Sequence, residues 1–195
     1  MTLDDAIASV ADYLVERDLR EVVLAGHSYG AMIISGIHDR MPDRIRRLVY
    51  WNAFVPHDGE SLLDLAPAQM GGLFKAMADA SDDASFMLPW PVWRDLFFND
   101  GDAEGARSAY DRPSPQPYAT FADKITLGST PASWEVGKSY VNSMMDAAMP
   151  HSRGWHPNLS ERLGLFRLVQ VMGGHEGCFV DPEGTARALH VAGRE

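Results

Sequence analysis

The sequence has little of several things, and each shortage excludes a class of protein. A single cysteine, Cys178, occurs among 195 residues, so no internal disulfide can form and no thiolate metal site is suggested. Lys and Arg number 17 against 27 Asp and Glu, and the net charge of -10 argues against nucleic acid or anionic membrane as a partner. No apolar run approaches the roughly 20 residues of a membrane span. The first residues, MTLDD, lack the basic and apolar regions of a signal peptide, so we expect a cytoplasmic protein.

What remains is the composition of an ordinary globular domain, with 46% hydrophobic residues. Apolar periodicity predicts an opening order of helix, strand, helix, strand, which indicates parallel strands joined by helices. The fold class expected is therefore α/β with a mostly parallel sheet. The elements predicted are a helix over 2–18, strands over 21–25, 47–51, 138–143 and 166–172, and a last helix from Asp181 to about residue 191. The first strand is uniformly apolar, which predicts that both its faces are buried.

One motif stands out, because the apolar run Val22–Ala25 leads directly into Gly-His-Ser-Tyr-Gly and then into a helical pattern over 31–37. This order of strand, tight turn and helix is the context in which a Gly-x-Ser-x-Gly motif carries a nucleophile. We therefore predict that Ser28 is a nucleophile. A Cβ at Gly26 or Gly30 is expected to collide with the neighbouring strand or helix. The alternative is a glycine-rich turn without chemistry.

The middle of the chain differs from the rest, because most of the aromatic residues, prolines and methionines gather there. We predict a core over 1–56 and 136–195 and a cap region, residues 57–135, inserted over the carboxyl edge of the sheet. Methionine and aromatic side chains suit an apolar substrate pocket, although the small core of the cap itself would use the same residue types. The side chains predicted to bind substrate are His27, Phe54, His57, Trp90 and Trp93.

A serine hydroxyl needs a base to take its proton, and the base needs an anion to orient it. Loops from several strands meet at the carboxyl ends of a parallel sheet. Ser28 follows the first predicted strand, Asp146 the third and His175 the fourth, so these three residues are the predicted triad. Asp123 and Asp181 remain alternatives for the acid, and His175 could be a solvated loop histidine. No metal site and no cofactor are expected.

Several segments together resemble the α/β-hydrolase superfamily. They are Gly26–Gly30, Val55–Ser61, Asp146–Pro150 and the pair Gly174-His175. The sequence looks most like the branch of plant hydroxynitrile lyases, methyl-ester esterases and their bacterial relatives. Lyase members of that branch use a lysine near the acid loop, and no matching lysine is present here.

The resemblance implies acyl transfer to water. Ser28 would attack, His175 would relay the proton, Asp146 would orient His175, and the N–H of Tyr29 would donate to the oxyanion. We expect a serine hydrolase that cleaves a small, rather apolar carboxylic ester, thioester or lactone. The alternatives are a non-catalytic hydrolase-like scaffold and, with less support, cyanohydrin cleavage of the lyase type.

The chain departs from the family pattern at its start. Family members normally carry strands before the helix at 2–18, and a loop among them gives a second oxyanion donor, worth about 2.7–4 kcal/mol. The strand 21–25 then lacks a sequence partner on one side, and a bare apolar edge invites pairing. We expect either a sequence shortened at its N-terminus or a second chain, such as a homodimer partner, across this strand.

Overall fold

The computed structural model describes residues 1–195, apart from the side chain of His151. The described chain forms an α/β fold around a four-stranded sheet in the order β1-β2-β5-β6, with each pair of neighbours parallel. The bounds are β1 Val22–Ser28, β2 Ile45–Ala53, β5 Gly137–Ser143 and β6 Arg167–Val171. The predicted parallel sheet is therefore confirmed, and each predicted strand is found within a few residues of its expected position.

The helices that cover the sheet begin at the caps that the sequence predicts. Helix α1 (Leu3–Glu16) starts at Thr2, whose hydroxyl accepts from the N–H of Asp5 while the Asp5 carboxylate accepts from the N–H of Thr2. Helix α9 (Pro182–Gly193) starts at Asp181, whose carboxylate accepts from the N–H of Gly184. The helix that follows the Gly-x-Ser-x-Gly motif is α2 (Gly30–Arg40).

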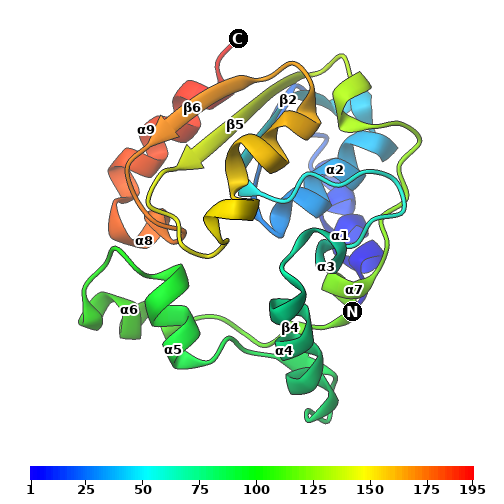
Figure 1. Ribbon diagram of the computed structural model, residues 1–195. Coiled ribbons are helices and arrows are strands. Elements are labelled where there is room, and N and C mark those ends of the chain that lie inside the picture. Colours follow the sequence, from blue (N-terminus) through cyan, green and yellow to red (C-terminus); the bar gives the residue numbers. More distant parts are fainter.

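The two faces of the sheet bury alternate residues of the same strands. Leu48 and Tyr50 of β2 lie in the larger core, with side chains of α1 and α2. Val49 and Trp51 lie in a smaller cluster on the other face, under Ala188 of α9. Figure 1 shows α9 on the side of the sheet opposite to α1 and α2. This arrangement leaves the carboxyl ends of the strands free for loops.

Strand β1 lies at the edge of the sheet, as expected from its missing sequence partner. The prediction that its faces are buried is wrong, because most of its residues are only half-buried and Ala25 is exposed. An edge strand is covered from one side only, so an apolar run does not ensure burial. Among the helices that the structure describes, none combines the length and the apolarity that crossing a membrane requires.

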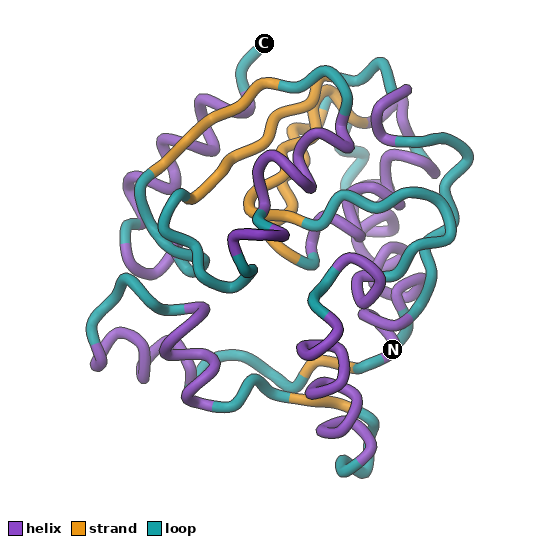
Figure 2. The backbone as a smooth tube through the Cα atoms, viewed as in Figure 1, coloured by secondary structure: helices purple, strands orange, loops and turns teal.

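The cap region is mostly short helices and loops beyond the carboxyl ends of the strands (Figures 1 and 2). Its elements and the remaining short helices are α3 Leu62–Leu65, α4 Ala68–Asp79, β3 Ser85–Phe86, α5 Trp90–Val92, η2 Trp93–Phe97, α6 Ala103–Tyr110, β4 Gln116–Pro117, α7 Ala119–Ala122, η1 Pro42–Arg44, η3 Pro131–Ser133, η4 His151–Arg153, η5 Trp155–Leu159, η6 Ser160–Leu163 and α8 Gly177–Val180. Strands β3 and β4 pair antiparallel as a two-stranded ribbon. The division into core and cap at residues 57 and 135 stays a prediction.

Candidate active site

Ser28 occupies the sharp turn between β1 and α2. Its φ angle of 51° lies in the left-handed region, which side chains other than glycine seldom adopt. Gly26 allows the turn to close, since a Cβ there would lie 2.7 Å from the carbonyl oxygen of Gly30 and 2.9 Å from the nitrogen of Ala31. The turn therefore holds a strained serine at the carboxyl end of a strand, as the motif predicts.

Gly30 behaves differently from Gly26, and the expectation of a collision there is wrong. A Cβ built on Gly30 would meet no atom within 4 Å among the described residues. Gly30 is the first residue of α2, where the chain has already turned away from β1. Only the first glycine of the motif is thus required by close approach.

His175 and Asp146 form a buried pair. Nδ1 of His175 lies 2.6 Å from Oδ2 of Asp146, and the two side chains are 2% and 0% exposed. Because an ionised carboxylate only accepts hydrogen bonds, the proton lies on Nδ1. In the neutral tautomer with its proton on Nδ1, Nε2 is free to accept a proton from a hydroxyl.

Two further donors hold the Asp146 carboxylate. The side-chain amide of Asn52 donates to Oδ2, and the N–H of Ala148 donates to Oδ1 at 2.8 Å. Burial pushes the pKa of Asp146 up, but the nearby His175, its hydrogen bond and the hydrogen bond from the N–H of Ala148 contribute to a larger opposite effect, and the pKa is lowered below its ordinary value. Asp146 is therefore held as an anion, which is the state that orients an imidazole.

Asn52 is a functional candidate that the sequence analysis missed. Its side chain is fully buried, its φ angle is 35°, and its Oδ1 accepts from the N–H of Ser143 at 2.6 Å. Asn52 thus joins the end of β2 to the loop that carries Asp146. Its only signal in the sequence was a polar residue directly after an apolar strand.

Ser28, the predicted nucleophile, and His175, the predicted base, line the same cavity. No hydrogen bond between the Ser28 hydroxyl and the His175 imidazole is formed in the described structure. In ligand-free sites such catalytic contacts are often long and tighten when substrate binds. The arrangement therefore fits a triad in which the hydrogen bond between His175 and Asp146 is formed and the one between Ser28 and His175 is not.

Aromatic rings surround the His175 imidazole. The ring centroids of His27, Phe97 and Trp155 lie 4.4, 5.1 and 5.4 Å from it. Burial, followed by the nearby His175, lowers the pKa of His27 well below its ordinary value, so His27 stays neutral. These rings shield the His175–Asp146 pair from water, which strengthens the electrostatic interaction between them.

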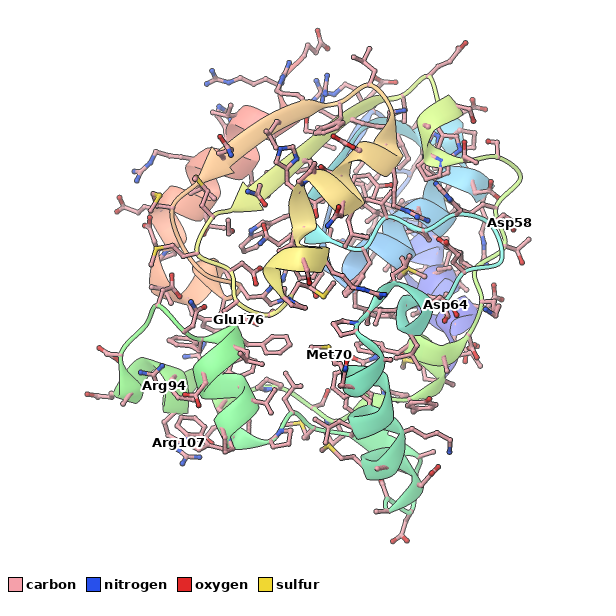
Figure 3. All side chains as sticks on the ribbon, viewed as in Figure 1. Asp58, Asp64, Met70, Arg94, Arg107 and Glu176 are labelled. Carbon is pink, nitrogen blue, oxygen red and sulfur yellow. The ribbon has the colours of Figure 1, made fainter. Side chains whose placement is uncertain are left out.

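The cavity has a volume of about 190 Å³ and a mostly apolar wall. Figure 3 shows Met70, one of its lining residues, on the side of α4 that faces the cavity, with Arg94 and Arg107 on the outer side of the cap. The lining residues are Ser28, Phe54, Leu62, Met70, Phe74, Phe86, Met87, Leu88, Trp93, Phe97, Tyr110, Pro113, Ser114, Gln116, Phe121, Ala148, Met149, Trp155 and His175. The sequence analysis missed Trp155 and Met149, since they lie outside the predicted cap.

Of the five side chains predicted to bind substrate, Phe54 and Trp93 line the cavity. His27, His57 and Trp90 do not. His27 packs behind the base, between Trp51 and His175. The backbone N–H of His57 donates to the Glu60 carboxylate, three residues along the chain, at 2.7 Å. The indole ring of Trp90 packs edge-to-face against the Tyr110 ring. The Arg107 guanidinium lies 3.9 Å from the centroid of the Trp90 ring.

Tyr29 directly precedes α2, at the position where helix N–H groups lack intrahelical partners. Its backbone N–H therefore fits an oxyanion donor beside Ser28, and this role stays a prediction. Among the side chains that the structure describes, no cluster of three or more His, Cys, Asp or Glu could hold a metal ion. Nδ1 of His156 lies 2.7 Å from the hydroxyl of Ser160.

Comparisons with known proteins agree with this architecture. The alpha/beta hydrolase family profile matches residues 1–188. A carbendazim hydrolyzing esterase of Nocardioides sp. (strain SG-4G) is 46% identical over 105 residues, which cover 50% of this chain and 42% of the relative. The putative methylesterase 14 of Arabidopsis thaliana is 24% identical over 86% of this chain and 51% of its own length. The chain thus spans about half the length of these curated relatives.

Solved structures show the same relationship. An extracellular alpha/beta-hydrolase from a Paenibacillus species, described as sharing structural and functional homology with tobacco salicylic acid binding protein 2, superposes with a TM-score of 0.96. It is 34% identical, and the match covers 100% of this chain and 81% of that one. The Arabidopsis methylesterase MES16 shares the fold, with a TM-score of 0.72 at 18% identity over 97% of this chain and 76% of that one. The chain therefore belongs to the alpha/beta hydrolase family, and it is similar to plant methylesterases and to bacterial members of that family.

Proposed function

We propose that the protein hydrolyses small, uncharged carboxylic esters, with Ser28 as nucleophile, His175 as general base and Asp146 as the acid that orients His175. The observation that carries the proposal is the buried His175–Asp146 hydrogen bond of 2.6 Å in the wall of the cavity that also contains Ser28. Relatives named esterase and methylesterase support the same reaction class.

In the proposed reaction, the Ser28 hydroxyl attacks the ester carbonyl while its proton moves to Nε2 of His175. The backbone N–H of Tyr29 donates to the oxyanion of the tetrahedral intermediate. His175 then gives the proton to the leaving alcohol, and an acyl-enzyme remains on Ser28. Water, deprotonated by His175, releases the acid and restores the serine.

The cavity indicates what kind of ester fits. An engineered apolar cavity of about 150 Å³ binds benzene, so about 190 Å³ suits a single ring bearing a small ester group. Apart from His175, no side chain of an ionisable acid or base other than the Tyr110 phenol is found among the described residues of the wall. A charged substrate would therefore lose its hydration without gaining an ionic partner. The absence of lysine from the same described wall gives cyanohydrin cleavage no support.

The test is hydrolysis of neutral monocyclic esters, methyl benzoate and phenyl acetate, together with labelling by a fluorophosphonate probe. Ser28→Ala should lower kcat by up to about 10⁶-fold and abolish labelling, as for other serine hydrolases. Ser108→Ala is the matched control, since Ser108 is exposed on α6. A folded wild type that neither turns over the esters nor takes the probe would instead establish a non-catalytic scaffold.

Two further parts of the proposal concern a partner chain and the location in the cell. The half-exposed edge strand β1 can pair with a second copy of the chain or with a partner chain, because an unpaired strand edge offers free N–H and C=O groups. A monodisperse monomer by light scattering would contradict the homodimer. A cytoplasmic location is proposed from the sequence alone, and fractionation of producing cells tests it.

A further inference from the structure

The two loops that carry Asp146 and His175 are joined to each other and to the cap. The N–H of Met145, which precedes Asp146, donates to the carbonyl of Gly173 at 2.9 Å. Two consecutive cap residues contact the same loops from outside. The Asn99 amide donates to the carbonyl of Met145 at 2.8 Å, and the Asp100 carboxylate accepts from the N–H of Gly174 at 2.6 Å.

The contact with Gly174 is so close that a side chain there would have to displace the side chains of Asn99 and Asp100. A Cβ on Gly174 would lie 2.5 Å from Oδ1 of Asp100 and 2.6 Å from Oδ1 of Asn99. Both cap oxygens therefore rest against the backbone immediately before His175. The glycine of the Gly-His pair therefore leaves room for these two side chains of the cap.

The cap residues that make these contacts are themselves anchored. Phe98 is 2% exposed and lies in a cluster with Trp93 and Ala106. Its N–H donates to the carbonyl of Trp93 at 2.8 Å. Phe97, one residue earlier, places its ring against the His175 imidazole. The segment 97–100 thus contacts the base through a ring and holds both loops through hydrogen bonds.

We propose that Asn99 and Asp100 are positioning residues that fix the loops of Asp146 and His175, so that the geometry of the pair depends on the seating of the cap. Neither residue is among those that line the cavity, and the hydrogen bonds from Asn99 and to Asp100 join them to the backbone of Met145 and Gly174. Each acts one residue away from a member of the pair. The role in turnover rests on the proposed function, whereas the role in holding the loops does not.

Two variants of Asp100 distinguish the effect of its hydrogen bond from the effect of its charge. Asp100→Ala removes the acceptor of the Gly174 N–H, whereas Asp100→Asn keeps an oxygen acceptor and removes only the charge. Asn99→Ala removes the donor to Met145 and is the second test if Asp100→Ala does not fold. Asp102→Ala is the matched control, because Asp102 lies in the same loop but caps α6 through the N–H of Gly105.

In ester hydrolysis, Asp100→Ala and Asn99→Ala are expected to lower kcat by about 10- to 100-fold with little change in KM, since a misplacement of about 1 Å can cost 10²-fold. Asp100→Asn should retain most of the activity, and Asp102→Ala should match the wild type. Equal losses in Asp100→Asn and Asp100→Ala would assign the effect to charge and overturn the proposal.

A second readout needs no turnover. The Nδ1–H proton of His175, hydrogen-bonded to Asp146, should give a far-downfield proton resonance in the wild type. Its exchange with water should become faster in Asp100→Ala and Asn99→Ala, because loss of the hydrogen bonds from the cap to the two loops promotes local opening. The exchange should stay unchanged in Asp100→Asn and Asp102→Ala. Unchanged exchange in both alanine variants would overturn the proposal. If the wild type hydrolyses no ester but the exchange rates follow this order, the proposed function is wrong and the positioning role of Asn99 and Asp100 is supported.

Discussion

Replacing Gly26 by alanine is expected to destabilise the turn that carries Ser28, whereas the same replacement at Gly30 is not. The new Cβ at position 26 would lie 2.7 Å from the oxygen and 2.8 Å from the carbonyl carbon of Gly30. Ordinary contacts of a Cβ begin at about 3.4 Å, so the start of α2 must move away from β1 by about 0.7 Å. These are backbone atoms, which cannot turn aside as a flexible side chain can.

The expected size of the effect follows from packing. Forcing an additional carbon into a filled site costs about 1–3 kcal/mol in free energy of unfolding. At Gly30 the space is open and the residue is helical, so alanine is expected to be neutral or to stabilise by up to about 1 kcal/mol. The two variants should then differ by about 1–4 kcal/mol. For a chain of this length, 1 kcal/mol corresponds to roughly 2–4 °C in Tm.

Urea unfolding followed by tryptophan fluorescence measures the difference, since the chain holds 5 Trp. Fluorophosphonate labelling of the same samples reports the turn itself, and Gly26→Ala should label much more slowly than the wild type. Equal stability of the two variants, or a larger loss at Gly30, would show that close approach of β1 and α2 does not determine the turn.

Other changes test the surroundings of the pair. Asn52→Ala removes a donor from the buried Asp146 carboxylate and should cost about 1–3 kcal/mol in urea unfolding, together with a lower kcat; an unchanged stability would contradict the assigned hydrogen bond. Burial raises the pKa of Glu176, which lies where the cap meets the core (Figure 3). A raised carboxyl pKa means that stability is lost as pH rises from the ordinary value of about 4.5 through the folded pKa. Glu176→Gln should therefore raise Tm at pH 8 and have no effect below pH 4.5, whereas the same change at the exposed Glu161 should have little effect at either pH; a gain in Tm that is equal at both pH values would refute the assignment.

Local signals were enough to predict most of the core. Thr2 and Asp181 are side-chain caps whose effect reaches only the next turn, and both helices begin where these residues predict. The order of Ser28, Asp146 and His175 at the carboxyl ends of strands follows from the topology of a parallel sheet. These inferences needed no knowledge of distant contacts.

The features that the sequence did not predict all depend on contacts between distant residues. Asn99 and Asp100 contact loops 46 and 74 positions away, and nothing in their neighbourhood indicates those partners. The outward position of Trp90 and the inward position of Trp155 depend on how short cap helices are oriented, which apolar content alone does not determine. The open space at Gly30 likewise depends on the angle at which α2 leaves the turn.

The ring of aromatic neighbours around His175 has a consequence for how the imidazole can move. Half a rotation about its Cβ–Cγ bond would move each ring nitrogen to the place of a ring carbon, and the ring would have to turn past His27, Phe97 and Trp155, whose centroids lie 4.4–5.4 Å away. The same rotation would break the bond to Asp146. In the proposed reaction, the proton that passes from Ser28 to the leaving alcohol would therefore travel on a stationary ring, entering and leaving through Nε2 of His175.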